Sequence, residues 1–136
     1  MNDATAETLC VVVERALSHP PEKVWRALTQ PHLIAEWLMK NDFAPRVGHR
    51  FSLTADWGGV DCVVEEIEPY RTLSYAWDTK DLRSTVTWTL TPTAGGTLLR
   101  MEQEGFLPEQ KPYHRGASAA WPRFISELEG VLERLD

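Results

Sequence analysis

The chain has 136 residues, of which 43% are hydrophobic and 25% charged, and these proportions are typical of one globular domain spanning residues 1–136. Its formal net charge of −6 argues against nucleic acid and against a membrane surface as partners, because both are bound through clusters of Lys and Arg. No apolar run approaches the ~20 residues of a membrane span, and no secretory leader is evident, so we expect a cytoplasmic protein.

The first third of the chain is predicted to form one strand and two short helices. The segment 9–17 is apolar and rich in Val, which favours a strand. Pro21 then suits the first turn of a short helix, and a second short helix is expected over residues 32–39, after Pro31. Neither helix is long enough to be stable alone, so both must pack on the rest of the domain.

From about residue 49, apolar side chains alternate with polar ones, which predicts five antiparallel strands joined by short turns. The glycine pairs 58–59 and 95–96 are predicted to form hairpin turns. One face of this meander is apolar and carries Phe51, Leu53, Trp57, Tyr75, Trp77, Val86, Trp88, Leu90, Leu99 and Met101. The other face is rich in Thr, Ser and Asp, and we expect it to be solvated.

A loop over residues 104–113 is predicted to lead into a long C-terminal helix. The helix has one strongly apolar face, formed by Trp121, Phe124, Ile125, Leu128, Leu132 and Leu135. A single helix laid across a curved sheet can leave a hollow beneath it. Whether that space is a filled core or a pocket is the main functional question.

Pro122 gives this helix two possible beginnings. Either the helix starts near Trp121 with Pro122 in its first turn, or a helix from about His114 continues and kinks, because Pro clashes with the carbonyl of Ser118. We favour the kinked helix, since residues 115–120 are compatible with a helix. A kink would widen the mouth of a cavity beside Trp121.

The sequence contains no recognisable metal or nucleophile motif. Cys10 and Cys62 lie in apolar strand-like runs, and we expect both to be buried, reduced and unreactive, with a disulfide or a reactive thiol as the alternative. Neither H-E-x-x-H nor C-x-x-C occurs, although the chain has four histidines, His19, His32, His49 and His114. We therefore expect no metal and no cofactor.

Several short sequences occur in an order that resembles one family. They are Val13-Glu14-Arg15, residues 21–28, Glu36-Trp37, residues 73–77, Gly96-Thr97, Glu104-Gly105-Phe106 and Trp121-Pro122. These strings resemble proteins related to the C-terminal domain of the heat-shock protein 90 ATPase activator, a branch of the START and birch pollen allergen superfamily. The resemblance covers essentially the whole chain. It implies the α+β helix-grip fold: a strand, two short helices, a five-stranded antiparallel meander and a long C-terminal helix over a curved sheet.

The resemblance also implies a ligand-sized cavity between sheet and helix, but no shared catalytic motif. The aromatic side chains that face the helix could line such a cavity or fill the core. We predict a lining of Trp57, Tyr75, Trp77, Trp88, Met101, Trp121, Phe124 and Ile125. Arg15 and His114 are candidate polar contacts for a ligand. The alternatives are an ion pair at the sheet edge for Arg15 and a surface position for His114.

Three functions are compatible with these observations. The leading interpretation is a binder of a small hydrophobic or aromatic molecule, with little or no enzymatic activity. A cyclase-like or hydrolase-like enzyme would use the same cavity and would need an inward-facing acid or base. A chaperone or regulator interaction module would need an exposed apolar patch. We expect no stimulation of a chaperone ATPase, because the eponymous co-chaperone binds its chaperone through an additional N-terminal domain that is not evident here. The chain could be a monomer or a homodimer.

Overall fold

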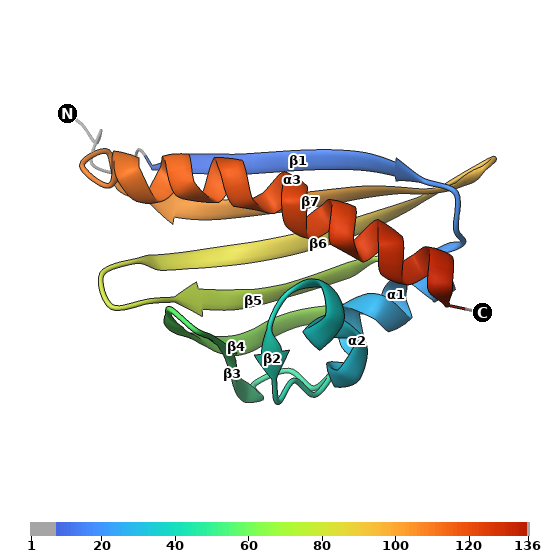
Figure 1. Cartoon of the computed structure of the whole chain (residues 1–136), viewed down its shortest axis with the longest axis horizontal. Helices are drawn as coiled ribbons and strands as arrows, with labels where there is room; N and C mark the ends of the chain where they lie inside the picture. Colours follow the sequence, from blue (N-terminus) through green and yellow to red (C-terminus); the bar gives the residue numbers. More distant parts are fainter. Residues whose placement is uncertain (1–7, 136) are drawn as a thin grey trace.

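One antiparallel sheet of seven strands wraps around a long helix, and two short helices close the remainder of the same face (Figure 1). The computed structural model describes residues 8–135. In chain order the elements are β1 (Leu9–Leu17), α1 (Pro21–Thr29), α2 (Pro31–Trp37), β2 (Lys40–Asn41), β3 (Arg50–Ala55), β4 (Gly58–Glu68), β5 (Thr72–Asp78), β6 (Arg83–Thr93), β7 (Gly96–Phe106) and α3 (Lys111–Arg134). The sheet order is β1-β7-β6-β5-β4-β3-β2. The predicted α+β helix-grip fold is confirmed.

The predicted meander corresponds to β3–β7, each strand pairing antiparallel with the next. β1 returns to pair with β7, and the two-residue strand β2, which the sequence did not indicate, extends the opposite edge. Nine of the ten residues predicted for the apolar face are buried, the exception being Trp57. Alternation of apolar and polar side chains therefore fixed which face of the sheet meets the helices.

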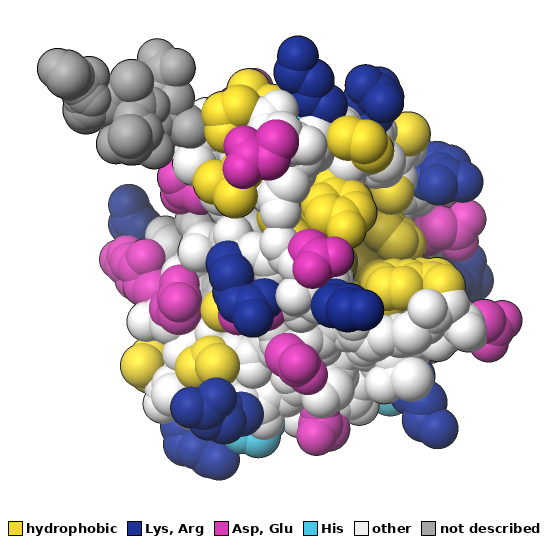
Figure 2. Space-filling model, turned by 90° about the vertical axis from the view of Figure 1, so that its left-hand side faces the viewer, with side chains coloured by type: hydrophobic (Ala, Val, Ile, Leu, Met, Phe, Trp, Pro, Cys, Tyr) yellow, Lys and Arg dark blue, Asp and Glu magenta, His cyan; other side chains and the backbone are white. Residues whose placement is uncertain are grey.

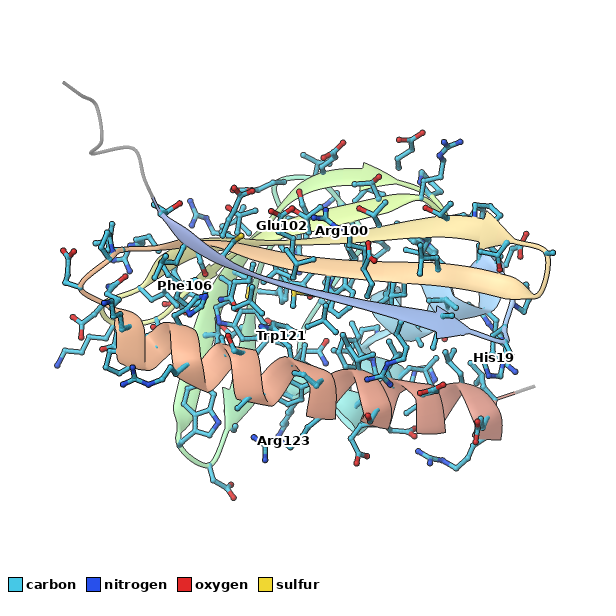
Figure 3. All side chains as sticks on the ribbon, turned by 90° about the horizontal axis from the view of Figure 1, so that it is seen from above. His19, Arg100, Glu102, Phe106, Trp121 and Arg123 are labelled. Atoms are coloured by element: carbon cyan, nitrogen blue, oxygen red, sulfur yellow. The ribbon has the colours of Figure 1, made fainter. Side chains whose placement is uncertain are left out.

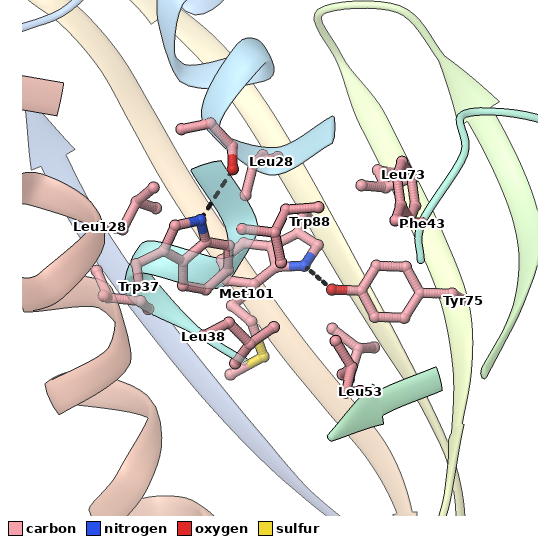
Figure 4. Packing of buried hydrophobic residues seen from close by; sticks show 14 of the residues in the cluster. Leu28, Trp37, Leu38, Phe43, Leu53, Leu73, Tyr75, Trp88, Met101 and Leu128 are labelled. Atoms are coloured by element: carbon pink, nitrogen blue, oxygen red, sulfur yellow. Dashed lines mark hydrogen bonds between the residues drawn. The ribbon is translucent and has the colours of Figure 1, made fainter. Parts of the chain in front are cut away.

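The core is centred on Trp88, which is fully buried on β6. Its ring packs edge-on against Trp37 of α2 and Trp121 of α3, with ring centroids 5.5 Å and 5.7 Å away. Its indole N–H donates to the Tyr75 hydroxyl at 3.0 Å, while the indole of Trp37 donates to the Ala27 carbonyl at 2.8 Å (Figure 4). Because both buried N–H groups have acceptors, these large rings fill the core without a desolvation penalty.

Three boundaries differ from the sequence predictions. The β3–β4 turn is formed by Asp56 and Trp57, because Ala55 already pairs with Gly58. Trp57 thus sits on the hairpin tip and is 66% exposed, rather than lying on the apolar face of the sheet. The predicted loop over 104–113 is mostly regular structure, since β7 extends to Phe106 and α3 begins at Lys111. The two-residue turn between β6 and β7 likewise falls one residue early, at Ala94 and Gly95.

The helix α3 continues through Pro122 without interruption, so the segment before this proline is helical, as favoured from the sequence. In the view of Figure 1 the axis of α3 changes direction about midway along its length. The helix packs against β1, β7, α1 and α2. Its second half buries Ile125, Leu128, Val131 and Leu132, which pack into the core.

The prediction that both cysteines are buried is wrong for Cys10 and confirmed for Cys62. Cys10 lies on β1, where alternation turns its side chain outward while the neighbouring Val11 points into the core. In an apolar segment that forms an edge strand, only alternate side chains are therefore buried. Burial, with smaller contributions from Asp61, Asp78 and Asp42, raises the pKa of the Cys62 thiol well above its ordinary value.

Candidate ligand-binding cavity

A cavity of about 470 Å³ lies between the first half of α3 and the sheet. Its wall consists of α3, the ends of β5 and β7, the β5–β6 loop, the tip of the β3–β4 hairpin and Met39, which follows α2. The lining residues are Met39, Trp57, Trp77, Thr79, Leu82, Gln103, Phe106, Pro112, Tyr113, Gly116, Ala117, Ala120, Trp121, Arg123 and Phe124. At the end of the molecule where α3 begins, hydrophobic side chains gather around a hollow (Figure 2).

The cavity exists because α3 carries small side chains over this part of the sheet. Gly116, Ala117 and Ala120 share one helix face and all line the cavity. A Cβ built on Gly116 would meet no atom within 4 Å, so the space opposite it is open. Further along the same helix, Trp121 and Ile125 fill the corresponding space. The change from small to large side chains along α3 therefore sets the inner end of the cavity.

Aromatic rings form the inner wall and one side of the mouth. Trp121 is 2% exposed, and its ring centroid lies 5.2 Å from that of Trp77 and 5.5 Å from that of Phe124. Trp57 lines the mouth from the hairpin tip. Such a set of rings presents a large, rigid apolar surface to a ligand at little cost in side-chain entropy.

Phe106 reaches the cavity because of a bulge at Gly105. In β7 the odd-numbered residues from Thr97 to Gln103 point inward, so simple alternation would turn Phe106 outward. Opposite β1, however, Leu9 pairs with Phe106 and Cys10 pairs with Glu104, which leaves Gly105 as the extra residue. Gly105 has φ +119, and a Cβ there would lie 2.6 Å from the Arg83 carbonyl oxygen, so only glycine fits without strain.

A chain of buried hydrogen bonds ends at the cavity. The Trp121 indole N–H donates to the Gln103 side-chain oxygen at 2.7 Å, and the Gln103 amide nitrogen donates to the Ser84 hydroxyl at 3.0 Å. The Ser84 hydroxyl donates in turn to the Trp77 carbonyl at 2.6 Å. A primary amide has two N–H groups and two oxygen lone pairs, so Gln103 keeps one of each without a partner among residues 8–135. This buried amide is the polar group best placed to bind a ligand.

The mouth is held together by contacts between the start of α3 and the β5–β6 loop. The Tyr113 hydroxyl donates to the Asp81 carboxylate at 3.2 Å, and Gln110 donates to the Asp81 carbonyl at 2.7 Å. The hydrogen bond to Asp81 raises the pKa of the Tyr113 hydroxyl, which is therefore neutral at physiological pH. These contacts fix the position of one rim of the cavity relative to the other.

The structure separates the predicted lining residues into two groups. Four of them, Trp57, Trp77, Trp121 and Phe124, line the cavity. The other four, Tyr75, Trp88, Met101 and Ile125, lie in the core and are at most 4% exposed. In this group, Trp88 is covered by α2 and α3, and Tyr75 is covered by Phe43 and Phe51. The sequence pattern alone could not distinguish these covered positions from the open end.

The two predicted polar contacts lie away from the cavity lining. Arg15 of β1 pairs with Glu129 of α3 at 3.0 Å, which matches the ion-pair alternative. A ring nitrogen of His114 lies 2.9 Å from the Cys10 carbonyl, and its ring packs edge-on against Phe106 from behind the cavity. Both side chains fasten α3 to β1 and β7.

Gln103, Phe106 and Arg123 are among the lining residues that sequence reasoning missed. Gln103 could have been found by continuing the alternation of β7 two residues past Met101. Phe106 depends on the bulge at Gly105, for which the glycine is the only signal in the sequence. Arg123 is exposed on α3 and gives no signal of its own in the sequence.

Two further observations apply to residues 8–135 only. Within this range, no group of three or more His, Cys, Asp or Glu side chains lies close enough together to hold a metal ion. The helices in the same range are too short or too polar to cross a membrane.

Comparison with known proteins places the fold within a family. The sequence profile for the activator of Hsp90 ATPase homolog 1-like proteins matches residues 18–133, and the chain belongs to this family. Among proteins with curated descriptions, none matches the chain.

Solved structures support this assignment. Protein MLL2253 from Mesorhizobium loti is 60% identical, with a TM-score of 0.92 over 94% of this chain and 99% of that one. Protein BH1534 from Bacillus halodurans is 27% identical, with a TM-score of 0.82 over 92% of this chain and 98% of that one. DynU16, a protein of the dynemicin biosynthetic locus, is 25% identical with a TM-score of 0.83; the match covers 91% of this chain and 47% of DynU16.

Proposed function

We propose that this protein binds a small hydrophobic or aromatic molecule in the cavity under the first half of α3, with Gln103 as the polar contact. The observation that carries the proposal is an apolar cavity of about 470 Å³ that contains a buried amide with unused hydrogen-bonding capacity. Ligand cavities in proteins are mostly apolar with a few convergent polar groups, and run from roughly 300 to 1,000 Å³. DynU16, a similar protein, belongs to the dynemicin biosynthetic locus, which is consistent with small-molecule binding by this fold.

The lining favours binding over catalysis. Among the described residues that line the cavity there is no Asp, Glu, His, Lys or Cys. General acid–base chemistry near neutral pH usually employs such a group, and the raised pKa of Tyr113 keeps its hydroxyl protonated, so it supplies no base there. The large exposed apolar residues, Val12, Val47, Trp57, Tyr70, Leu107 and Tyr113, are distributed over several elements. Two of them, Trp57 and Tyr113, belong to the mouth of the cavity.

The test is a titration of intrinsic tryptophan fluorescence with a panel of aromatic molecules and fatty acids. Three indoles line the cavity, so we expect a saturable change with members of the panel. Ala117→Leu should abolish this change, because the larger side chain would occupy the cavity. Ala119→Leu is the matched control, since Ala119 is exposed two residues away on the same helix and does not line the cavity.

Melting curves should show that both variants fold. Saturable binding that survives Ala117→Leu would place the ligand elsewhere. A flat titration for every probe with the unmodified chain would contradict the proposal.

A further inference from the structure

The lining of the cavity carries charge of one sign only. We propose that its ligand is an aromatic or otherwise apolar carboxylate, bound with the carboxylate at the mouth beside Arg123 and the apolar end inward against Trp121. This inference rests on the proposed binding function and specifies the chemical class of the ligand and its orientation.

Arg123 is the only charged residue among the described lining residues. It is exposed, and Figure 3 shows that it projects to the opposite side of α3 from Trp121, which points toward the sheet. The positive charge therefore lies at the outer rim, while the rings lie further in. A guanidinium group offers paired N–H donors whose spacing matches the two oxygens of a carboxylate.

Within residues 8–135, the guanidinium group of Arg123 makes no ion pair or hydrogen bond with another residue. The ion pairs within residues 8–135 involve Arg15, Arg71, Arg100 and Arg134. No hydrogen bond of Arg123 occurs in this part of the chain either. Glu127 follows one helical turn later, but it is not within ion-pair distance. Arg123 can therefore bind an anion without breaking a contact that holds the fold together.

Acidic side chains are kept out of the lining, although the chain carries 20 Asp and Glu against 14 Lys and Arg. The carboxylate of Asp81, at the rim, already accepts a hydrogen bond from the Tyr113 hydroxyl. A protein with a net charge of −6 repels anions in general, so a lining with one Arg and no acidic residue is a local exception.

The orientation follows from solvation. Deep in the cavity a carboxylate would lose its water and meet aromatic rings and the neutral Gln103 amide but no cation, which is costly for an unpaired charge. At the mouth it keeps part of its hydration and gains Arg123. The apolar end of the same molecule then buries its surface against Trp77, Trp121 and Phe124.

The experiment is a calorimetric titration with three probes that share a naphthalene ring and differ in charge: naphthoate, naphthalenemethanol and naphthylmethylamine. With the unmodified chain we expect naphthoate to bind about fivefold more tightly than the neutral alcohol, the size expected for one partly exposed ion pair. The amine should bind more weakly than the alcohol. Raising the salt concentration to about 1 M should reduce the preference for naphthoate, because the Debye length falls to ~3 Å.

Two substitutions at Arg123 test the contact itself. Arg123→Gln should remove the preference for naphthoate while leaving the affinity for the alcohol unchanged. Arg123→Glu should reverse the preference, so that the amine binds better than naphthoate. Arg115→Gln is the matched control, because it makes the same change in net charge on the same helix at an exposed residue outside the lining, and it should leave the preference intact.

The outcomes separate this inference from the proposed function. Equal affinities for all three probes, or a preference that Arg123→Gln does not alter, would overturn the carboxylate assignment and leave the cavity as a binding site. If none of the three probes binds, the proposed function fails, and the present inference fails with it.

Discussion

At the residue scale, Trp121 connects the cavity to the core. Its ring contacts Trp88, which is fully buried, and its indole N–H donates a hydrogen bond to the side-chain oxygen of Gln103 at the cavity wall. Removing either partner of a buried hydrogen bond leaves the other unsatisfied, which typically costs about 1–3 kcal/mol. The contact thus fixes the orientation of the Gln103 amide in the cavity wall.

We predict that Trp121→Phe and Gln103→Leu each lower the free energy of unfolding by about 1–3 kcal/mol. The double variant should lose less than the sum of the two, because both changes remove the same hydrogen bond. Chemical denaturation of the four proteins measures this coupling. Strictly additive losses would show that the hydrogen bond contributes nothing to stability.

The two cysteines should differ sharply in reactivity. Cys10 is exposed on the edge strand, whereas Cys62 is buried and its pKa is raised, so that little thiolate forms at neutral pH. We predict that a thiol reagent modifies one cysteine per native chain rapidly and the second only on unfolding. Cys10→Ser should abolish the rapid phase. Two rapid phases, or a rapid phase that survives this substitution, would contradict the assignment of exposure.

At the scale of elements, the sequence predicted the strands and their inner faces well but located the cavity less well. Period-two alternation identified β3–β7, and it correctly turned residues such as Leu53 and Leu99 inward. It could not show that Trp57 occupies a turn, because a two-residue hairpin loop interrupts alternation without changing the composition. Nor could it show that Trp88 lies in the closed core while Trp77, also buried, lines the cavity, since this depends on where the helices lie.

The helix α3 combines two functions along its length. Its first half carries small side chains and leaves the cavity open, while its second half fills the core. Pro122 lies at the junction and cannot donate a hydrogen bond to the Ser118 carbonyl. This arrangement places a weak point of the helix beside the cavity.

We predict that Pro122→Ala stabilises the protein by about 1–3 kcal/mol, because a proline inside a helix is roughly 3 kcal/mol less favourable than alanine. Association of an apolar probe should become slower if the proline keeps the mouth wide. Thermal unfolding and stopped-flow binding measure the two effects. Pro112→Ala provides the comparison, since Pro112 lies in the first turn, where proline is tolerated, and should change stability little. A destabilised Pro122→Ala variant would show that the proline suits its place in the helix.

At the scale of the whole molecule, one scaffold provides both a closed core and an open end. The antiparallel sheet curves around α3, while α1 and α2 close the part near the C-terminal half of that helix (Figure 1). At the opposite end, small residues on α3 and the β3–β4 and β5–β6 hairpins surround the open cavity. Residue pattern and family resemblance together predicted this architecture. The location of the opening depends on side-chain sizes along α3 and on the bulge at Gly105.

The central claim is that a small apolar molecule binds under the first half of α3. The six indole N–H signals in a nitrogen–proton NMR spectrum test it most directly, because the tryptophans are distributed across the molecule. Each signal can be assigned by single Trp→Phe substitutions. On titration with naphthoate, we predict that the signals of Trp57, Trp77 and Trp121 shift in a saturable way, while that of Trp25, which lines a separate surface pocket beside α1, stays fixed. A shift at Trp25 with none at Trp77 or Trp121, or no saturable shift at any indole, would contradict the account.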